Sequence, residues 1–414
     1  MLSLDYIRQN LEKVKAACEH KNRPADLNKL LKLDEKNRQL LTNIGELRQK
    51  RNQLARSQSG KEQIEKGREL KVQVKKLEAE QIEVEKALNE LLFKVPNVPY
   101  DEVPIGKDEK DNQEIKKQGQ MPEFKFKPLS HLELIKKHDL ADLERGNKVA
   151  GFRGYFLKKE LALLHFALLW YVYLKMFKKG YTPLIAPSLV KDFTLFGSGQ
   201  FPWGREEVYH LEKDDLYLAG TAEVPVTAYY SNELLLEKEL PKKFFAFSPC
   251  FRREAGSYGK DTKGLYRLHE FQKIEQVIIG LADDKLAREL HEELQQNVEE
   301  ILTDLGLPYR VLLMCTGDMG EPHAKKYDTE VWMPSRNGYG EAASNSIMTD
   351  FQARRLKIRY RNKQGETKFC YTFNNTALAS PRILIALLEN YQQDNGSILI
   401  PKVLQNLTGL TQIG

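Results

Sequence analysis

The chain has 414 residues, of which 41% are hydrophobic, so it is long enough for two domains, one of them with a large core. Acidic and basic residues interrupt its first residues before an apolar run forms, which excludes a signal peptide and predicts a cytoplasmic protein. The cysteines at 18, 250, 315 and 370 are widely spaced without a C-x-x-C pair, so neither disulfides nor a zinc site is expected.

Two heptad patterns occupy the amino-terminal quarter of the chain. The first pattern runs through Leu33, Asn37, Leu40, Ile44, Leu47, Arg51 and Leu54. The second runs through Leu70, Val74, Leu77, Gln81, Val84, Leu88 and Leu91. The polar stretch 57–60 separates them, and Pro96 and Pro99 follow the second. This arrangement predicts an antiparallel coiled-coil hairpin that ends before Pro96.

The distal part of this hairpin is basic. Between Glu46 and Lys76 there are ten Lys or Arg residues and four Asp or Glu residues. The net charge of this segment is therefore +6, which equals the net charge of the whole chain. Such a surface favours a phosphate backbone and predicts salt-dependent binding of nucleic acid. The alternative is that the charges serve solubility and helix pairing, as they do in many coiled coils.

The longest apolar run, Leu161 to Phe177, is interrupted by His165 and Lys175 and is shorter than a typical membrane span. It therefore predicts a buried helix and no membrane association. Further along, Thr221-Ala-Glu-Val-Pro225 follows a short apolar stretch. On its own, this block indicates only a helix that begins with Thr221 as its cap.

The segment from Pro249 to Glu275 predicts a β-hairpin with a charged turn that contains glycines. Arg252 and Glu254 are two residues apart and share a face of an extended strand, and Arg267 and Phe271 lie on the returning strand. A guanidinium group can pair with a phosphate and an aromatic ring can cover a purine, so the set suits ATP. The glycines at 256, 259 and 264 lack the spacing of a P-loop.

Two more blocks follow. The first comprises Tyr339-Gly-Glu-Ala-Ala-Ser344 and Thr349-Asp-Phe-Gln-Ala-Arg-Arg355. The second, from Phe373 to Gln392, has leucines at helical spacing after Pro381 and Arg382, which predicts a buried helix that opens with an arginine.

These blocks resemble the motifs of class II aminoacyl-tRNA synthetases, and the segment from Cys250 to Glu275 is similar to the seryl-tRNA synthetase family, bacterial type. The resemblance covers most of residues 180–414. It includes Gly180 to Val190, which resembles motif 1 with Pro187 and implies a homodimer. The closing segment Ile398 to Leu404 is also similar to this family.

The resemblance implies roles for individual residues. It places serine at Thr221, Ala222, Glu223, Arg252, Glu275, Asn374 and Thr376. It places ATP at Arg252, Arg253, Glu254, Arg267, Phe271, Glu341, Ala342, Ala343, Ser344 and Arg382. Arg252 and Arg382 are the implied catalytic residues, and Glu341 and Ser344 would hold Mg²⁺ together with ATP.

Several residues depart from the family pattern. Asn345 and Ile347 stand where cysteine and asparagine are common, and we expect the change at Ile347 to lie close to the substrate. Asn375 and Pro381 each replace a glycine, and Glu270 stands where glutamine is common. Asparagine tolerates left-handed backbone angles, so Asn375 need not disrupt its turn.

We therefore expect an α+β protein with a tRNA-binding N-terminal domain over residues 1–105. A catalytic domain on a mainly antiparallel sheet is expected over residues 106–414. The implied function is the activation of L-serine with ATP to seryl-adenylate and the transfer of serine to tRNA(Ser), with tRNA(Sec) left open. The alternatives are a related ligase with an acceptor other than tRNA, and a non-catalytic RNA-binding protein.

Overall fold

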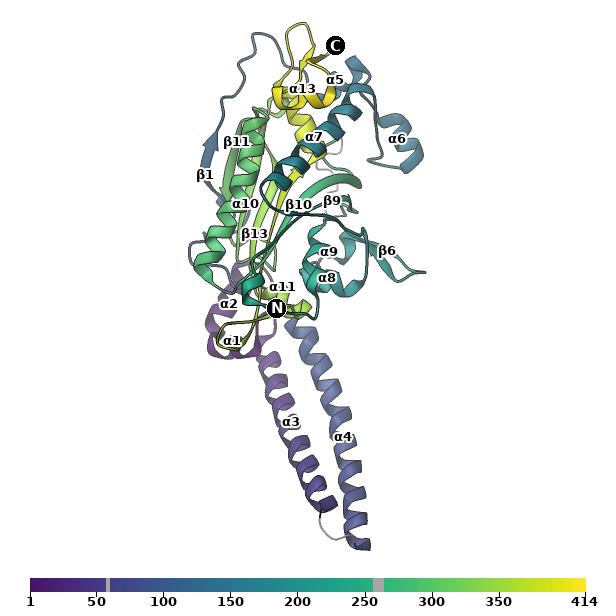
Figure 1. Cartoon of the computed structure of the whole chain (residues 1–414), viewed down its shortest axis with the longest axis vertical. Helices are drawn as coiled ribbons and strands as arrows, with labels where there is room; N and C mark the ends of the chain where they lie inside the picture. Colours follow the sequence, from purple (N-terminus) through teal and green to yellow (C-terminus); the bar gives the residue numbers. More distant parts are fainter. Residues whose placement is uncertain (57–59, 256–263) are drawn as a thin grey trace. The chain divides into compact units, whose positions relative to one another are not determined.

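The computed structural model of the chain describes residues 1–56, 60–255 and 264–414 (Figure 1). The chain divides into two compact units, Met1–Pro96 and Asn97–Gly414. The first unit ends earlier than the expected boundary at residue 105, because the segment after Pro96 is bonded within the second unit. Asn97 donates side-chain hydrogen bonds to the backbone carbonyls of Pro322 and Met348, each at 2.9 Å.

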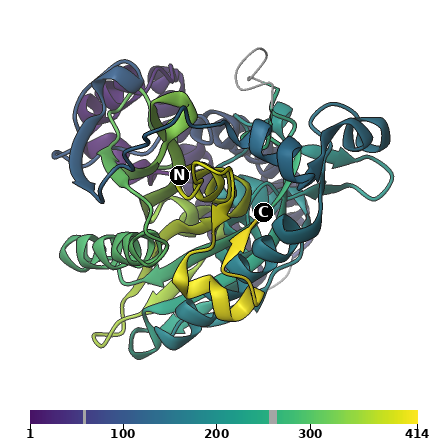
Figure 2. The same ribbon diagram turned by 90° about the horizontal axis from the view of Figure 1, so that it is seen from above.

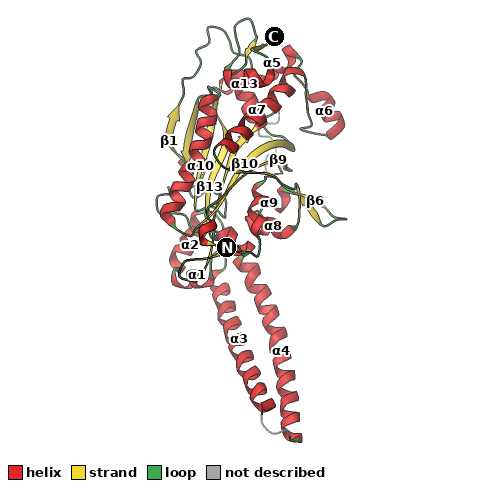
Figure 3. Cartoon of the chain, viewed as in Figure 1, coloured by secondary structure: helices red, strands yellow, loops and turns green. Residues whose placement is uncertain are grey.

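The first unit contains only helices, among the residues described. They are α1 (Leu4–Gln9), α2 (Leu11–His20), α3 (Leu27–Arg56) and α4 (Lys61–Leu92). Helices α3 and α4 form the predicted coiled-coil hairpin, drawn in red in Figure 3. All heptad residues are buried or half-buried, and Gln81 donates a 3.1 Å hydrogen bond to Asn37 across the seam. The predicted turn at 57–59 lies outside the described residues.

The second unit is built on an eight-stranded sheet with the order β1-β11-β12-β13-β16-β10-β9-β4. In chain order these strands are β1 (Gln113–Gln118), β4 (Thr182–Ile185), β9 (Lys242–Phe251), β10 (Glu270–Gly280), β11 (Tyr309–Leu313), β12 (Lys325–Met333), β13 (Gly338–Thr349) and β16 (Tyr371–Ala379). Every pair is antiparallel except β4 with β9. The α+β fold with a mainly antiparallel sheet is confirmed.

Shorter strands and helices surround this sheet (Figure 2). The remaining strands are β2 (Ala141–Asp142), β3 (Phe156–Leu157), β5 (Leu189–Val190), β6 (Tyr209–Leu211), β7 (Leu216–Leu218), β8 (Leu234–Leu236), β14 (Arg359–Arg361), β15 (Thr367–Phe369), β17 (Ile398–Leu399) and β18 (Gln412–Ile413). The α-helices are α5 (His131–His138), α6 (Leu143–Ala150), α7 (Lys159–Lys178), α8 (Asp192–Ser198), α9 (Glu223–Thr227), α10 (Asp284–Asp304), α11 (Phe351–Leu356), α12 (Ser380–Asn390) and α13 (Lys402–Thr408). The 3₁₀ turns are η1 (Glu109–Asp111), η2 (Arg205–Glu207), η3 (Ala228–Tyr230), η4 (Glu237–Glu239) and η5 (Pro334–Arg336).

Helix α7 contains the apolar run that predicts a buried helix. One of its sides supplies Leu161, Leu168 and Val172 to the main hydrophobic core. Another side is exposed and carries Phe166 and Trp170. Within the described part of the chain, α7 is the one helix with the length and apolar composition of a membrane span. Its apolar residues are thus divided between the core and an uncovered surface.

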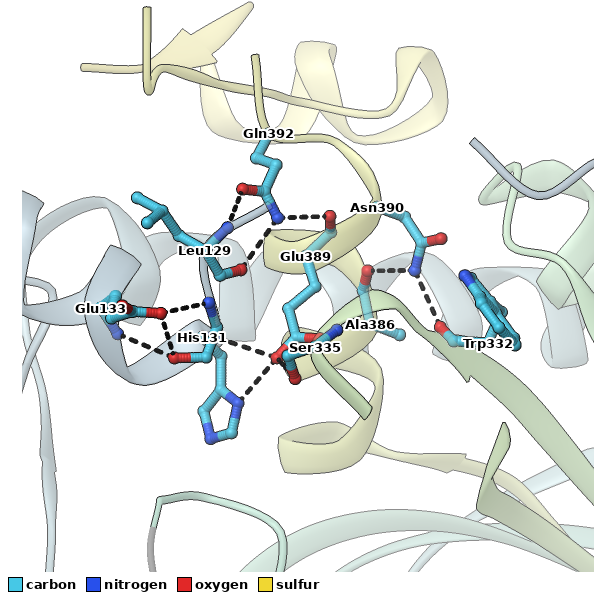
Figure 4. A network of polar contacts seen from close by, with 10 residues as sticks. Leu129, His131, Glu133, Trp332, Ser335, Ala386, Glu389, Asn390 and Gln392 are labelled. Atoms are coloured by element: carbon cyan, nitrogen blue, oxygen red, sulfur yellow. Dashed lines mark hydrogen bonds and ion pairs between the residues drawn. The ribbon is translucent and has the colours of Figure 1, made fainter. Parts of the chain in front are cut away.

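Helix α12 is fixed at its C-terminal end by a buried carboxylate (Figure 4). Glu389 accepts hydrogen bonds from the backbone N–H and Nδ1 of His131, both at 2.9 Å. It also accepts from the backbone N–H of Ser335 at 3.0 Å and from its hydroxyl at 2.8 Å. A fully buried carboxylate needs such partners, and these tie α12 to α5 and η5. The opposite end of α12 presents Arg382.

Candidate active site

A pocket opens where the ends of β9, β10, β13 and β16 meet the start of α12. Its walls include many of the residues that the sequence implied for ATP and serine. They are Arg252, Glu254, Arg267, Phe271, Glu341, Ala342, Ala343, Thr376 and Arg382. The pocket is completed by Leu265, Tyr266, Leu268, Lys273, Ala379 and Pro381.

The predicted hairpin is formed by β9 and β10, and Arg252 follows the last residue of β9. Its Nε donates to the carbonyl of Gly220 at 3.2 Å, and its guanidinium lies 5.3 Å from the centre of the Phe271 ring. Arg267 donates to Glu254 at 3.0 Å. The two arginines are therefore held at the pocket wall by different partners. The glycines at 256 and 259 lie outside the described residues.

Arg382 and Glu341 form the opposite wall of the pocket. One Nη atom of Arg382 lies 3.0 Å from the Glu341 carbonyl oxygen and 3.2 Å from its carboxylate. Burial opposes ionisation of Glu341, but the positive charges of Arg382 and Lys326 outweigh it and lower its pKa to about 2. Glu341 is thus an anion at neutral pH, beside cations that suit phosphate.

A β-bulge lies between Glu341 and Ser344 on β13. Their partners on β12 are Glu330 and Asp328, and the register shifts between them. In a regular strand, residues three apart point to opposite faces, and one extra residue restores them to the same face. Ser344 is the register partner of Asp328, whose pKa burial raises to about 6. Ser344 lies next to the pocket but is not one of its lining residues.

A buried polar cluster adjoins the pocket wall at Lys273 and Thr376. Glu275 Oε2 pairs with Lys273 Nζ at 2.5 Å and accepts a hydrogen bond from the Thr376 hydroxyl at 3.2 Å. Lys273 also donates to the Thr221 hydroxyl at 2.7 Å. The cluster thus joins three of the residues implied for serine, and it offers hydroxyl and carboxylate groups to a small polar ligand.

Glu223 and Asn374 form a second polar group. Asn374 Nδ2 donates to Glu223 Oε1 at 3.0 Å, and Gln352 Nε2 donates to the same oxygen at 2.8 Å. Burial raises the pKa of Glu223 to about 7, and the nearby carboxylate of Glu275 acts in the same direction. Ala222 precedes Glu223 and is fully buried. This carboxyl group therefore changes its charge near neutral pH.

The sequence reasoning missed Lys273 and Gln352 as site residues. Lys273 is two residues from both Phe271 and Glu275, so the period of a strand places all three on one face and could have identified it. Gln352 belongs to the run Asp350 to Arg355, but no spacing in that run points to Glu223. Its contact arises because α11 packs near α9, and no local pattern contains that information.

Arg253 does not line the pocket. Its side chain is exposed and its guanidinium lies 5.0 Å from the centre of the Tyr209 ring. The structure therefore does not bring Arg253 to the pocket lining, and its contact with ATP stays a prediction.

The departures at Asn345, Ile347 and Asn375 lie on the side of the sheet that faces α10. Asn345 donates to the carbonyl of His291 at 2.9 Å, and Asn375 donates to that of Leu294 at 2.8 Å. Ile347 is fully buried in the main core. The expectation that Ile347 lies close to the substrate is wrong, because the strand directs this side chain away from the pocket.

The sequence matches two family profiles. Residues 1–99 match the seryl-tRNA synthetase N-terminal domain, and residues 207–391 match the tRNA synthetase class II core domain (G, H, P, S and T). A serine–tRNA ligase of Treponema denticola is 42% identical, and the alignment covers 100% of both chains. That of Deinococcus radiodurans is 44% identical over 99% of this chain and 98% of the relative.

Solved structures agree with these relatives. The seryl-tRNA synthetase from Pyrococcus horikoshii complexed with ATP has a TM-score of 0.93 and 37% identity, covering 100% of this chain and 99% of the other. The cytoplasmic serine–tRNA ligase from Naegleria fowleri in complex with AMP has a TM-score of 0.88 and 31% identity, covering 99% and 96%. These findings support the ligase and neither of the alternatives, and by similarity over its whole length the chain belongs to the seryl-tRNA synthetase family.

Proposed function

We propose that this chain forms seryl-adenylate from L-serine and ATP and then transfers serine to tRNA(Ser). The observation that carries the proposal is the arrangement of Arg252, Arg382 and the Glu275 cluster around one pocket. Two guanidinium groups suit the phosphates of ATP, and the buried carboxylate and hydroxyl suit a small amino acid with a hydroxyl group.

The first step needs alignment of reactants and no nucleophilic side chain. The carboxylate of serine is ionised at neutral pH and attacks the α-phosphorus of ATP, with pyrophosphate as the leaving group. Arg252 orients the two anions, and Arg382 holds the terminal phosphates. The adenine lies against Phe271, while Arg267 and Glu254 flank the nucleotide. Preorganised cations lower the barrier because negative charge builds up on the phosphate in the transition state.

Serine selection is assigned to Glu275 and Thr376, with Thr221 and Glu223 near the ammonium group. Glu275 Oε2 is occupied by Lys273 and Thr376, which leaves Oε1 for the hydroxyl of serine. Alanine would leave these buried groups unpaired, and a site of this kind rejects such an analogue by a factor on the order of 10⁴. Lys273 acts as a positioning residue because it fixes the carboxylate.

Magnesium is proposed to accompany ATP at Glu341 and Ser344. An ionised carboxylate and a hydroxyl provide the oxygen ligands that this cation prefers. Among residues 1–56, 60–255 and 264–414, no group of three His, Cys, Asp or Glu side chains could hold a metal ion alone. Magnesium in proteins is usually bound by one or two carboxylates together with substrate phosphates, so ATP would supply further oxygen ligands and the ion would neutralise part of the phosphate charge.

The coiled-coil hairpin is assigned to tRNA. Several of its basic residues, among them Arg48, Lys66 and Lys75, are exposed along α3 and α4. Positive charges on the hairpin attract the negatively charged phosphate backbone, and the affinity falls as salt is added. We place the enzyme in the cytoplasm, where its substrates occur.

A homodimer is proposed from the uncovered apolar surface of α7 and β4. The exposed fraction is 69% for Phe166, 51% for Trp170 and 86% for Ile185. Exposed apolar side chains grouped in this way favour a protein interface. Their place next to the Gly180–Val190 segment fits a second copy of the chain, and sedimentation of the purified enzyme tests the stoichiometry.

Exchange of labelled pyrophosphate into ATP tests the adenylation step without tRNA. We expect exchange with serine and much weaker exchange with threonine, alanine or cysteine. Arg252→Ala should reduce the rate on the order of 10²- to 10³-fold, as loss of one transition-state partner does. Arg288→Ala is the matched control, because Arg288 pairs with Glu102 away from the pocket. Absence of serine-dependent exchange in the unmodified enzyme would contradict the proposed function.

A further inference from the structure

Three aromatic side chains from separate segments lie together beside the β9–β10 hairpin. The ring of His269 makes edge-on contacts with Phe152 and Tyr209, at centroid distances of 6.5 and 6.3 Å. Phe152 lies between α6 and β3 and is 57% exposed. Tyr209 and His269 are half-buried. We call Phe152, Tyr209 and His269 the aromatic patch.

Two guanidinium groups flank the aromatic patch. That of Arg253 lies 5.0 Å from the centre of the Tyr209 ring, and that of Arg153 lies 5.1 Å from the centre of the Phe152 ring. Arg253 is exposed, whereas Arg153 is buried beneath the Phe152 ring. An exposed ring next to an exposed cation suits unpaired nucleotides, because a base stacks on the ring and a phosphate pairs with the guanidinium group. An entirely apolar partner would gain nothing from the charge of Arg253.

The aromatic patch is continuous with the candidate active site. The backbone N–H of Arg252 donates to the carbonyl of His269 at 2.9 Å, and His269 Nδ1 lies 2.9 Å from the carbonyl oxygen of Arg252. Arg252 lines the pocket, whereas its neighbour Arg253 lies against the patch. Phe152 also lines a surface cleft that reaches Gly264, at the start of the returning limb of the hairpin.

We propose that the aromatic patch and Arg253 bind the unpaired nucleotides at the 3′ end of tRNA during transfer of serine. This inference rests on the proposed function, because the second step must bring the terminal ribose to the adenylate. The nucleotides that precede this ribose then cross the surface next to the pocket. The patch provides stacking surfaces and positive charge at that position.

The first test compares two exposed phenylalanines. Phe152→Ala should raise the KM for tRNA in aminoacylation by roughly 5- to 100-fold, the range expected for the loss of one stacked base. Serine-dependent pyrophosphate exchange should stay unchanged, since it needs no tRNA. Phe152→Trp should retain the affinity for tRNA. Phe156→Ala is the matched control, because Phe156 is 46% exposed and lies outside the patch.

The second test identifies the part of tRNA that is bound. The dissociation constants of the unmodified enzyme and Phe152→Ala are measured with intact tRNA(Ser) and with tRNA(Ser) trimmed of its unpaired 3′ nucleotides. The variant should lose affinity for intact tRNA only. An equal loss with both RNAs would place the contact elsewhere on tRNA and overturn the proposal, as would an unchanged affinity for both.

The exchange assay separates this inference from the proposed function. A raised KM for ATP in Phe152→Ala would assign the aromatic patch to the nucleotide pocket and would overturn the inference while leaving the function intact. No serine-dependent exchange in the unmodified enzyme would instead contradict the proposed function. The binding measurements with the two RNAs would still report on the patch in that case.

Discussion

The two faces of the central sheet use neighbouring residues of the same strands in different ways. On β16, Asn374 and Thr376 bond the carboxylates of Glu223 and Glu275, whereas Asn375 bonds the backbone of α10. Successive side chains of a strand point to opposite faces, so each face is constrained separately. The face with the pocket is constrained by charge, and the face against α10 is constrained by volume and hydrogen bonding.

This comparison explains three of the departures from the family, whereas a fourth, Pro381, lines the pocket. Asn345, Ile347 and Asn375 all lie on the face against α10, and the first and third are register partners on β13 and β16. Both asparagines bond α10, whose buried His291 has a pKa that burial lowers to about 3. The three departures are therefore changes in packing beneath a helix, and the pocket face keeps its charged residues.

The largest effect is expected for Lys273→Met on the pocket face. The side chains of Lys273 and Glu275 are 6% and 2% exposed, and they form a close ion pair. Removal of one partner leaves a buried charge uncompensated, which costs about 3–5 kcal/mol. We expect the free energy of unfolding in urea to fall by that amount and the KM for serine to rise more than the KM for ATP.

Lys273→Met combined with Glu275→Gln is the control for this effect. The double variant has no unpaired charge, so its free energy of unfolding should recover most of the loss while serine activation remains impaired. If the double variant is as unstable as the sum of the two single variants, the pair is not coupled and the positioning role of Lys273 is wrong.

A smaller effect is expected for Ile347→Asn, which restores the common family residue on the α10 face. Ile347 is fully buried in the main core, and a buried amide without a partner costs about 1–3 kcal/mol. We expect a loss of about 2–3 kcal/mol in the free energy of unfolding and an unchanged rate of serine-dependent exchange, because the side chain points away from the pocket.

Ile347→Val calibrates this prediction. The loss of one buried methylene costs about 0.5–1.5 kcal/mol and adds no polar group. A faster serine-dependent exchange in Ile347→Asn would show that the departure limits catalysis, which would contradict the separation of the two faces.

Much of the site could be predicted from the sequence because its residues lie in contiguous blocks with strand spacing. Arg252 and Glu254 show this, and so do Phe271 and Glu275. The direction of each side chain was harder to predict. The bulge between Glu341 and Ser344 reverses the alternation, and a bulge depends on pairing with β12, which no local pattern reveals. The same reason explains the misplaced Ile347, which lies after that bulge.

Contacts between segments far apart in the chain could not be predicted from the sequence either. Gln352 meets Glu223, and Phe152 meets His269, because separate elements pack together. The coiled-coil hairpin could be predicted more completely, since each seam is a repeat along one helix and needs no distant partner to be recognised.

The smallest effect concerns the protonation of Glu223 on the pocket face. Burial, assisted by Glu275, raises its pKa from 4.5 to about 7. The folded state therefore holds this proton more tightly than the unfolded chain, so the contribution to stability is complete below about pH 4.5 and is lost as the pH rises through about 7. The ammonium group of serine needs the ionised carboxylate. We thus expect the KM for serine to fall as the pH rises from 6 to 8.

Glu223→Gln isolates this titration because the amide oxygen can still accept the hydrogen bonds from Gln352 and Asn374. The variant should bind serine weakly at every pH, with a KM that no longer changes between pH 6 and 8. One pH unit below the pKa corresponds to a change of about tenfold in the ionised fraction, or about 1.4 kcal/mol. If the inflection near pH 7 persists in Glu223→Gln, another group titrates, and the contact between Glu223 and the serine ammonium is wrong. An inflection that disappears would show that the pocket face, unlike the face against α10, depends on the charge of a single buried carboxyl group.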